Sequence, residues 1–131
     1  MTHFPIDRST PMTYHVYMKA RWITIVETKA FEERAKSRMT REEVNSVITL
    51  IASNPLCGDV IKATGGIRKV RFAIGGKGKR GGVRIIYYFY NEDVPVFLLT
   101  VFAKNEKSDL TQSESKALAK LVKKLRVSYL D

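Results

Sequence analysis

The spacing of apolar and polar residues in the first half of the chain predicts one strand followed by two helices. The run of β-branched residues over 22–28 is typical of a strand, and a short helix is expected over residues 29–38. Thr40 and Glu43 then have the spacing of a capping box, and the apolar residues that follow recur on one face of a helix. An Asn-Pro pair at 54–55 is expected to end this second helix.

The second half of the chain has the pattern of a meander followed by a helix. Its strands are expected over residues 67–73, 83–90 and 94–103. In the first of them Lys69 and Arg71 alternate with apolar residues, so the two basic side chains should share one face of the sheet. Thr111 and Glu114 form a second capping box at the start of the last helix. The order β-α-α-β-β-β-α predicts an α+β domain, with two N-terminal helices and one C-terminal helix on a mostly antiparallel four-stranded sheet.

The length of 131 residues allows one hydrophobic core and no second domain. Residues 1–20 contain two prolines and show no sustained period, so we expect an N-terminal tail there, which could be flexible, and a single domain over 21–131. No apolar run approaches the roughly 20 residues of a membrane span, and no signal peptide is evident. The single cysteine, Cys57, excludes an internal disulfide and fits a reducing compartment. A cytoplasmic protein without membrane contact is therefore expected.

The charge of the chain points to an anionic partner. The formal net charge is +10, and between Lys62 and Tyr90 there are eight basic residues and no acidic one. All eight glycines also lie close to this stretch, between Gly58 and Gly82. A basic surface with accessible backbone and no neutralising carboxylate favours a polyanion, and nucleic acid is the first candidate.

The glycines of this stretch do not form a nucleotide-binding motif. Gly76, Gly78 and Gly81 satisfy G-x-G-x-x-G, but a strand follows them, whereas a dinucleotide fingerprint requires a helix. A phosphate-loop NTPase is excluded too, because no Ser or Thr follows the lysines. The loop is interpreted as a basic hairpin loop that carries Lys77, Lys79 and Arg80.

The sequence does not support catalysis by histidine, cysteine or serine. The only histidines, His3 and His15, lie in the N-terminal tail, and no hydrolase triad can be assembled. Neither a metal nor any other cofactor is expected. Catalysis, if the protein is an enzyme, must therefore rest mainly on lysine and arginine.

One reaction suits such a site, namely the cleavage of RNA. RNA supplies its own nucleophile, the 2′-hydroxyl, so a protein need only orient it, move protons and stabilise the charge on phosphorus. Clustered cations also lower one another's pKa, which helps a lysine to exchange protons near neutral pH. Lys69 and Arg71 share a face, and Arg84 on the next strand joins them if the register allows it.

Three segments carry a family resemblance: GGIRKVRF, GKGKRGGVRIIYYF and FLLTVFAKNEKSDLT. In this order and spacing the chain resembles the RelE superfamily of type II toxins, and most closely its HigB branch, from about Trp22 to Arg126. The resemblance implies a ribosome-dependent, metal-independent mRNA endonuclease that inhibits translation. It also implies a cognate antitoxin, which in the HigB branch usually has a helix-turn-helix domain.

The resemblance also assigns roles to individual residues. Lys69 and Arg71 would contribute proton transfer and phosphate binding, and Arg84 would stabilise the charge of the transition state. The chain departs from RelE-type toxins at Asn105, where they have arginine, and at Thr111, where they have tyrosine. Protonation of the leaving group is therefore expected to fall to one of two lysines in the same segment, Lys104 or Lys107.

Contacts to RNA and the ribosome are expected from a wider set of basic and aromatic residues. This set comprises Arg68, Lys77, Lys79, Arg80, Tyr88, Lys120, Lys123 and Lys124. For Tyr88 packing in the core is an alternative to base stacking, and the helical lysines could form a solvated face. Two other functions stay open: a ParE-like gyrase poison, which shares the fold without the basic set, and an RNA-binding module without catalysis.

Overall fold

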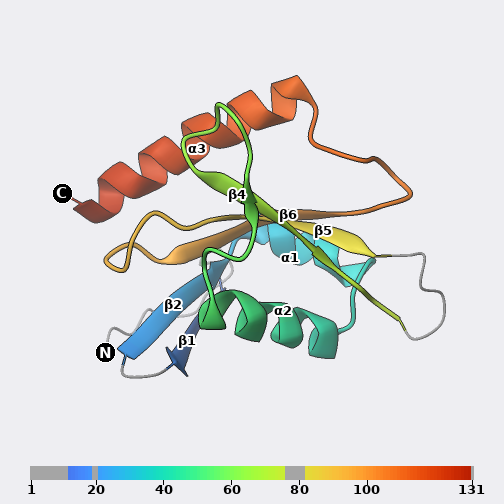
Figure 1. Cartoon of the computed structure of the whole chain (residues 1–131), viewed down its shortest axis with the longest axis horizontal. Helices are drawn as coiled ribbons and strands as arrows, with labels where there is room; N and C mark the ends of the chain where they lie inside the picture. Colours follow the sequence, from blue (N-terminus) through green and yellow to red (C-terminus); the bar gives the residue numbers. More distant parts are fainter. Residues whose placement is uncertain (1–11, 19–20, 76–81, 131) are drawn as a thin grey trace.

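In the part of the chain that the structure describes, six strands form one sheet that three helices cover (Figure 1). The computed structural model describes residues 12–18, 21–75 and 82–130. The strands are β1 (Met12–Met18), β2 (Arg21–Glu27), β3 (Asp59–Val60), β4 (Ile67–Phe72), β5 (Val83–Tyr88) and β6 (Val96–Ala103). The helices are α1 (Lys29–Lys36), α2 (Arg41–Ser53) and α3 (Gln112–Leu130).

The strand order in the sheet is β1-β2-β6-β5-β4-β3. Every neighbouring pair is antiparallel except β2 and β6, which run parallel. The parallel pair arises because α1 and α2 carry the chain away after β2, and the meander returns β6 to its side. The predicted α+β class, with helices on a mostly antiparallel sheet, is confirmed, whereas the predicted number of four strands is too low.

Both additional strands lie at the edges of the sheet. Strand β1 pairs with β2 along its whole length, from Met12 opposite Glu27 to Met18 opposite Arg21, in a segment for which the sequence predicts no element. Strand β3 has two residues and pairs with β4. The sequence of β1 does alternate, with Met12, Tyr14, Val16 and Met18 at every second position, so the expectation of no element there was wrong. A strand of two residues, by contrast, is too short to show any period.

Side-chain hydrogen bonds fix the start of each helix. Thr28 caps α1 and also donates from its hydroxyl to the Leu98 carbonyl in β6, at 2.8 Å. The predicted capping box of Thr40 and Glu43 begins α2. At the start of α3 the Thr111 amide donates to Glu114 Oε1, at 2.8 Å, and the Glu114 amide donates to Thr111 Oγ1, at 3.1 Å. Both capping boxes expected from the sequence are therefore present.

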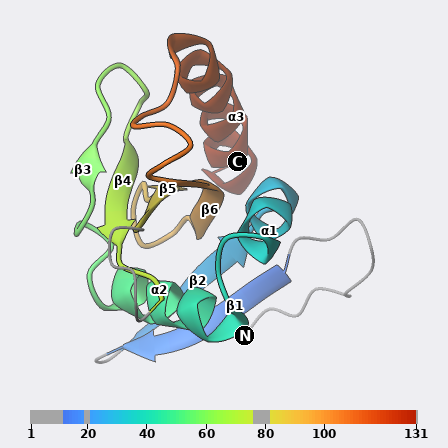
Figure 2. The same ribbon diagram turned by 90° about the vertical axis from the view of Figure 1, so that its right-hand side faces the viewer.

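The sheet separates two hydrophobic cores within the single domain, where one core was expected, with α1 and α2 on one face and α3 on the other (Figures 1 and 2). The first core contains Phe31 and Ile51 from these helices together with Tyr87, and the second contains Val122 of α3 together with Tyr88. Neighbouring strand residues thus face opposite cores, as the strand period requires. None of the described helices is long and apolar enough to cross a membrane.

Candidate active site

The register of β4 and β5 brings three basic residues to one face of the sheet. Arg71 lies directly opposite Arg84, and Lys69 is two positions away along β4, opposite Ile86. Ile67 and Ile86, which lie on the same face as these residues, belong to the core under α3. Lys69, Arg71 and Arg84, which we call the basic strand cluster, therefore share the α3 face. Val70 and Phe72 pack on the opposite core, as the alternation along β4 predicts.

The cluster is arranged to receive an anion. Like charges that lie directly opposite each other on paired strands are destabilising. Arg71 is exposed and Arg84 is half-buried, and in the described part of the chain no acidic side chain forms an ion pair with either of them. An arginine cannot lose its proton in a protein, so a bound anion would relieve the repulsion between the two.

One carboxylate does lie at the cluster. Asp109 Oδ2 accepts a hydrogen bond from Lys69 Nζ at 2.9 Å, across 40 positions of sequence. Its other oxygen, Oδ1, accepts from the Leu110 amide at 2.9 Å. The hydrogen bond from Lys69 is the largest cause that lowers the pKa of Asp109, and the charge of Arg84 lowers it further. Asp109 is a site residue that the sequence reasoning missed.

Asp109 belongs to the segment between β6 and α3, residues 104–111, which we call the strap. Figure 2 shows this segment passing from β6 to the side of β4 before α3 begins. Lys107, one of the two predicted proton donors, also lies in the strap. Its Nζ donates to Glu114 Oε2 at 2.6 Å and lies 5.0 Å from the centroid of the Phe102 ring. Because Phe102 is the β6 partner of Arg84, Lys107 lies beside the basic strand cluster.

The other predicted proton donor, Lys104, is exposed at the start of the strap. Its backbone amide donates to the Gly82 carbonyl at 3.0 Å, at the entry to β5. No contact of its side chain with the cluster is seen among the described residues. The geometry therefore places Lys107, and not Lys104, next to the predicted catalytic residues.

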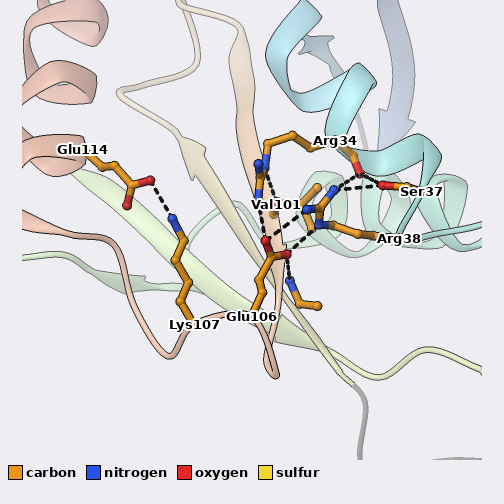
Figure 3. Close-up of polar contacts among 8 residues, drawn as sticks. Arg34, Ser37, Arg38, Val101, Glu106, Lys107 and Glu114 are labelled. Atoms are coloured by element: carbon orange, nitrogen blue, oxygen red, sulfur yellow. Dashed lines mark hydrogen bonds and ion pairs between the residues drawn. The ribbon is translucent and has the colours of Figure 1, made fainter.

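A group of charged residues holds the strap against α1 (Figure 3). Glu106 accepts from Arg38 Nε at 2.6 Å and from Arg34 Nη2 at 3.0 Å. It also accepts from the Ala103 amide at 2.7 Å, and Arg34 Nε donates to the Val101 carbonyl at 2.8 Å. The hydrogen bond from Arg38 is the largest cause that lowers the pKa of Glu106 to about 2. We call Arg34, Arg38 and Glu106 the strap clamp.

The residues predicted to contact RNA lie in several different places. Arg68 projects from the other face of β4, where Nη1 donates to the Gly58 carbonyl at 2.7 Å and the Leu56 carbonyl at 3.3 Å. It thereby supports the connection before β3 and is not part of the cluster. Tyr88 is fully buried under α3, and Arg126 Nη1 donates to its hydroxyl at 3.4 Å. Its ring has no free face for a base, so the packing alternative holds for Tyr88.

The remaining predicted contacts lie on α3 and in the hairpin loop. Lys120, Lys123 and Lys124 are exposed on α3. Lys77, Lys79 and Arg80 fall outside the residues that the structure describes. Within the described ranges, no group of three or more His, Cys, Asp and Glu side chains could hold a metal ion.

A hollow lies on the other side of the sheet from the basic strand cluster. It has a volume of about 480 Å³ and is lined by residues of β2, α1 and α2, among them Glu27 and Arg41. Glu27 is only 1% exposed and accepts from Arg41 Nη2 at 2.8 Å. This ion pair, in which Glu27 is buried and Arg41 is half-exposed, links the end of β2 to the start of α2. None of the predicted catalytic residues lines the hollow.

A protein-family model matches the part of the chain that contains the site. The sequence model described as the RelE toxin of the RelE/RelB toxin–antitoxin system matches residues 23–129. The match runs from β2 into α3 and includes the basic strand cluster, the strap and the strap clamp.

Proposed function

Because the chain belongs to the RelE family of toxins from toxin–antitoxin systems, we propose that it is an endoribonuclease that cleaves messenger RNA on the ribosome and so inhibits translation. Within the family we assign it to the HigB branch, on the three sequence segments quoted above. Its site is confined to the α3 face of the sheet and to the strap.

The observation that carries this proposal is the pairing of Arg71 with Arg84, with Lys69 on the same face. The two arginines bind the non-bridging oxygens of one phosphate, for which their planar forks are well suited. Their fixed charge stabilises the additional negative charge that develops on phosphorus when the 2′-hydroxyl attacks. Lys69 is the one member of the cluster with an exchangeable proton, and we assign it to proton transfer at the 2′-oxygen.

The leaving 5′-oxygen requires a proton from the other side of the phosphate. Lys107 is the candidate, because it lies over Phe102 beside Arg84 and is held in the strap. Its hydrogen bond to Glu114 orients the ammonium group in the absence of RNA. Lys107 thus takes the role of the arginine that RelE-type toxins have at the position of Asn105.

The rest of the basic surface would hold RNA without acting on it. Lys120, Lys123 and Lys124 on α3, together with the hairpin loop, suit contacts to phosphates of messenger or ribosomal RNA. An antitoxin is the second partner. With a net charge of +10 on the toxin, we expect the antitoxin to present acidic residues to it and to carry a helix-turn-helix domain, as in the HigB branch.

The direct test is cleavage of messenger RNA on programmed ribosomes, with the ends of the fragments mapped. Arg84→Ala and Lys69→Ala should each lower the rate, Arg84→Ala by about 10²–10³-fold, the usual loss when one donor to a transition state is removed. Lys29→Ala is the matched control, because Lys29 is an exposed cation at the start of α1, on the other face of the sheet. Its rate should be unchanged.

The outcomes separate the proposed function from its alternatives. Cleavage that survives both substitutions would show that the assigned site is wrong. Inhibition of DNA supercoiling with intact messenger RNA would instead indicate a gyrase poison. Binding of RNA with steep salt dependence but without cleavage would indicate an RNA-binding module.

A further inference from the structure

The pair of Asp109 with Lys69 is unusual because it places a carboxylate at a cluster that is otherwise open to an anion. Among the described residues, Asp109 is the acidic side chain that forms an ion pair with the basic strand cluster. Asp59 also lies near Lys69, as its partner in the register of β3 and β4, but its exposed side chain forms no ion pair within the described ranges. Lys69 thus pairs with Asp109, 40 positions away in the sequence, and not with Asp59, which lies opposite it in the sheet.

The strap fixes the position of Asp109. Glu106 ties the strap to Arg34 of α1 and to the Ala103 amide, and the capping box at Thr111 ties its other end to α3. Leu110, whose amide binds Asp109 Oδ1, packs against the core under α3. Both ends of the strap are therefore fixed, and they present the free oxygen of Asp109 to Lys69.

A carboxylate held in this way resembles a phosphate in the contacts that it makes. Both groups are anions that only accept hydrogen bonds, and both bind the lysine ammonium at about 2.7–2.9 Å. The pair is also easily opened, since the Lys69 and Asp109 side chains are 33% and 51% exposed, and exposed ion pairs are weak. A substrate phosphate can therefore replace the carboxylate on Lys69.

We infer that Asp109 occupies a phosphate position of the RNA-free site, so that RNA must displace its carboxylate from Lys69 in order to bind. This inference rests on the proposed function, since it takes RNA as the ligand of the cluster. Asp109 is a positioning residue: it keeps Lys69 at the cluster and competes with RNA for it. The exchange makes productive binding dependent on additional contacts, such as those that a ribosome supplies.

The test measures the affinity for a single-stranded RNA in which every 2′-hydroxyl is methylated, so that it binds without being cut. Asp109→Asn should bind it several-fold more tightly than the natural protein. The slope of log affinity against log salt concentration should stay nearly the same, because a phosphate contacts Lys69 in both complexes. The carboxamide introduced by this substitution keeps an oxygen for the Leu110 amide, so the strap should retain its path.

Asp59→Asn is the matched control, since it removes the same charge beside the same lysine without removing an ion pair. Its effect on the affinity should be smaller. In a Lys69→Ala background the gain from Asp109→Asn should disappear, because the competition acts through that lysine. An equal effect of the two aspartate substitutions, or a gain that persists without Lys69, would overturn the inference.

The cleavage assay on ribosomes keeps the two proposals apart. If the natural protein cuts messenger RNA and Asp109→Asn binds the methylated RNA no better, the proposed function stands and the exchange is wrong. If Asp109→Asn binds as expected while the natural protein does not cut, the exchange stands and the enzymatic function fails. Loss of cutting with unchanged binding would make Asp109 a participant in the chemistry, which also overturns the inference.

Discussion

Glu106 and Asp109 lie in the same strap and both bind cations, but their surroundings differ. Glu106 accepts from Arg34 of α1, from Arg38 just after this helix and from the Ala103 amide, so its carboxylate is held from several sides. Asp109 has one lysine and its neighbour's amide, and half of its side chain is exposed. The pKa of both carboxyls is lowered, that of Glu106 to about 2 by its hydrogen bond from Arg38 and that of Asp109 by its hydrogen bond from Lys69.

The comparison distinguishes a structural ion pair from an exchangeable one. A carboxylate with several charge-assisted hydrogen bonds resists replacement, because a competitor must satisfy every donor at once. A carboxylate with one exposed lysine is replaced by any anion that binds that lysine better. The strap thus combines a fixed anchor at Glu106 with a replaceable contact at Asp109, and Lys107 lies between them.

The largest effect is expected at Lys107. Lys107→Met should lower the cleavage rate on ribosomes by about 10²-fold or more, since general acids typically contribute 10²–10⁴-fold. Lys104→Met is the matched control from the same strap, because its side chain shows no contact with the cluster among the described residues, and it should retain most of the activity. The reverse result would assign the proton donor to Lys104 and remove Lys107 from the mechanism.

The next largest effect is expected when the strap clamp is broken. Glu106→Ala removes the acceptor of Arg34, Arg38 and the Ala103 amide and should lower the free energy of unfolding by about 1–2 kcal/mol. At this chain length that corresponds to roughly 3–8 °C in the midpoint of thermal unfolding. Glu33→Ala, at an exposed position of α1, is the control and should change little. Equal stability of the two variants would mean that the clamp contributes nothing.

Much of the fold could be predicted from the sequence, because the interior elements carry strong periods and caps. The alternation in β4 correctly predicted that Lys69 and Arg71 share a face, and both capping boxes were found from their spacing. The edge strand β3 was missed because two residues show no period, whereas the prediction of no element over β1 was wrong, since Met12, Tyr14, Val16 and Met18 alternate with Thr13, His15 and Tyr17. Whether Arg84 joins the cluster required the register, which the structure provides.

The parts of the site that sequence could not provide are long-range contacts of the strap. Glu106 meets Arg34 across 72 positions, and Asp109 meets Lys69 across 40. The strap has neither a helical nor a strand period, so no pattern indicates which way its side chains point. Arg68 was predicted to contact RNA because of its charge. The alternation along β4, however, places it on the face opposite to Lys69 and Arg71, where it binds the Gly58 carbonyl.

A smaller effect is expected from acid, and it should separate Glu106 from the other carboxylates. Its pKa in the folded protein is about 2, below the usual value of 4.5, so Glu106 stabilises the fold fully above pH 4.5. This contribution is lost as the pH falls from 4.5 through 2, because the carboxyl then binds a proton in the folded state too.

The measurement is the difference in free energy of unfolding between the natural protein and Glu106→Gln. Because the side chain is 32% exposed, we expect a difference of about 1 kcal/mol at neutral pH, after allowance for solvent screening. The difference should stay constant above pH 4.5 and shrink below it. The other acidic residues titrate in both proteins and cancel. A difference that is independent of pH down to 2 would show that the charge of Glu106 is not what stabilises the strap.

The smallest effect on stability is expected at Asp109, and it is the result on which the comparison depends. Asp109→Asn should change the free energy of unfolding by less than about 0.5 kcal/mol, since the pair with Lys69 is exposed and the Leu110 amide keeps an acceptor. The measurement is urea unfolding of Asp109→Asn and Glu106→Gln at the same pH and salt. If the slopes are equal, the shift of each urea midpoint gives the change in the free energy of unfolding. A loss as large as that of Glu106→Gln would make Asp109 a second anchor, and a strap anchored at both residues could not release Lys69 to RNA. A small loss, combined with tighter RNA binding, leaves competition for Lys69 as the contribution of the carboxylate.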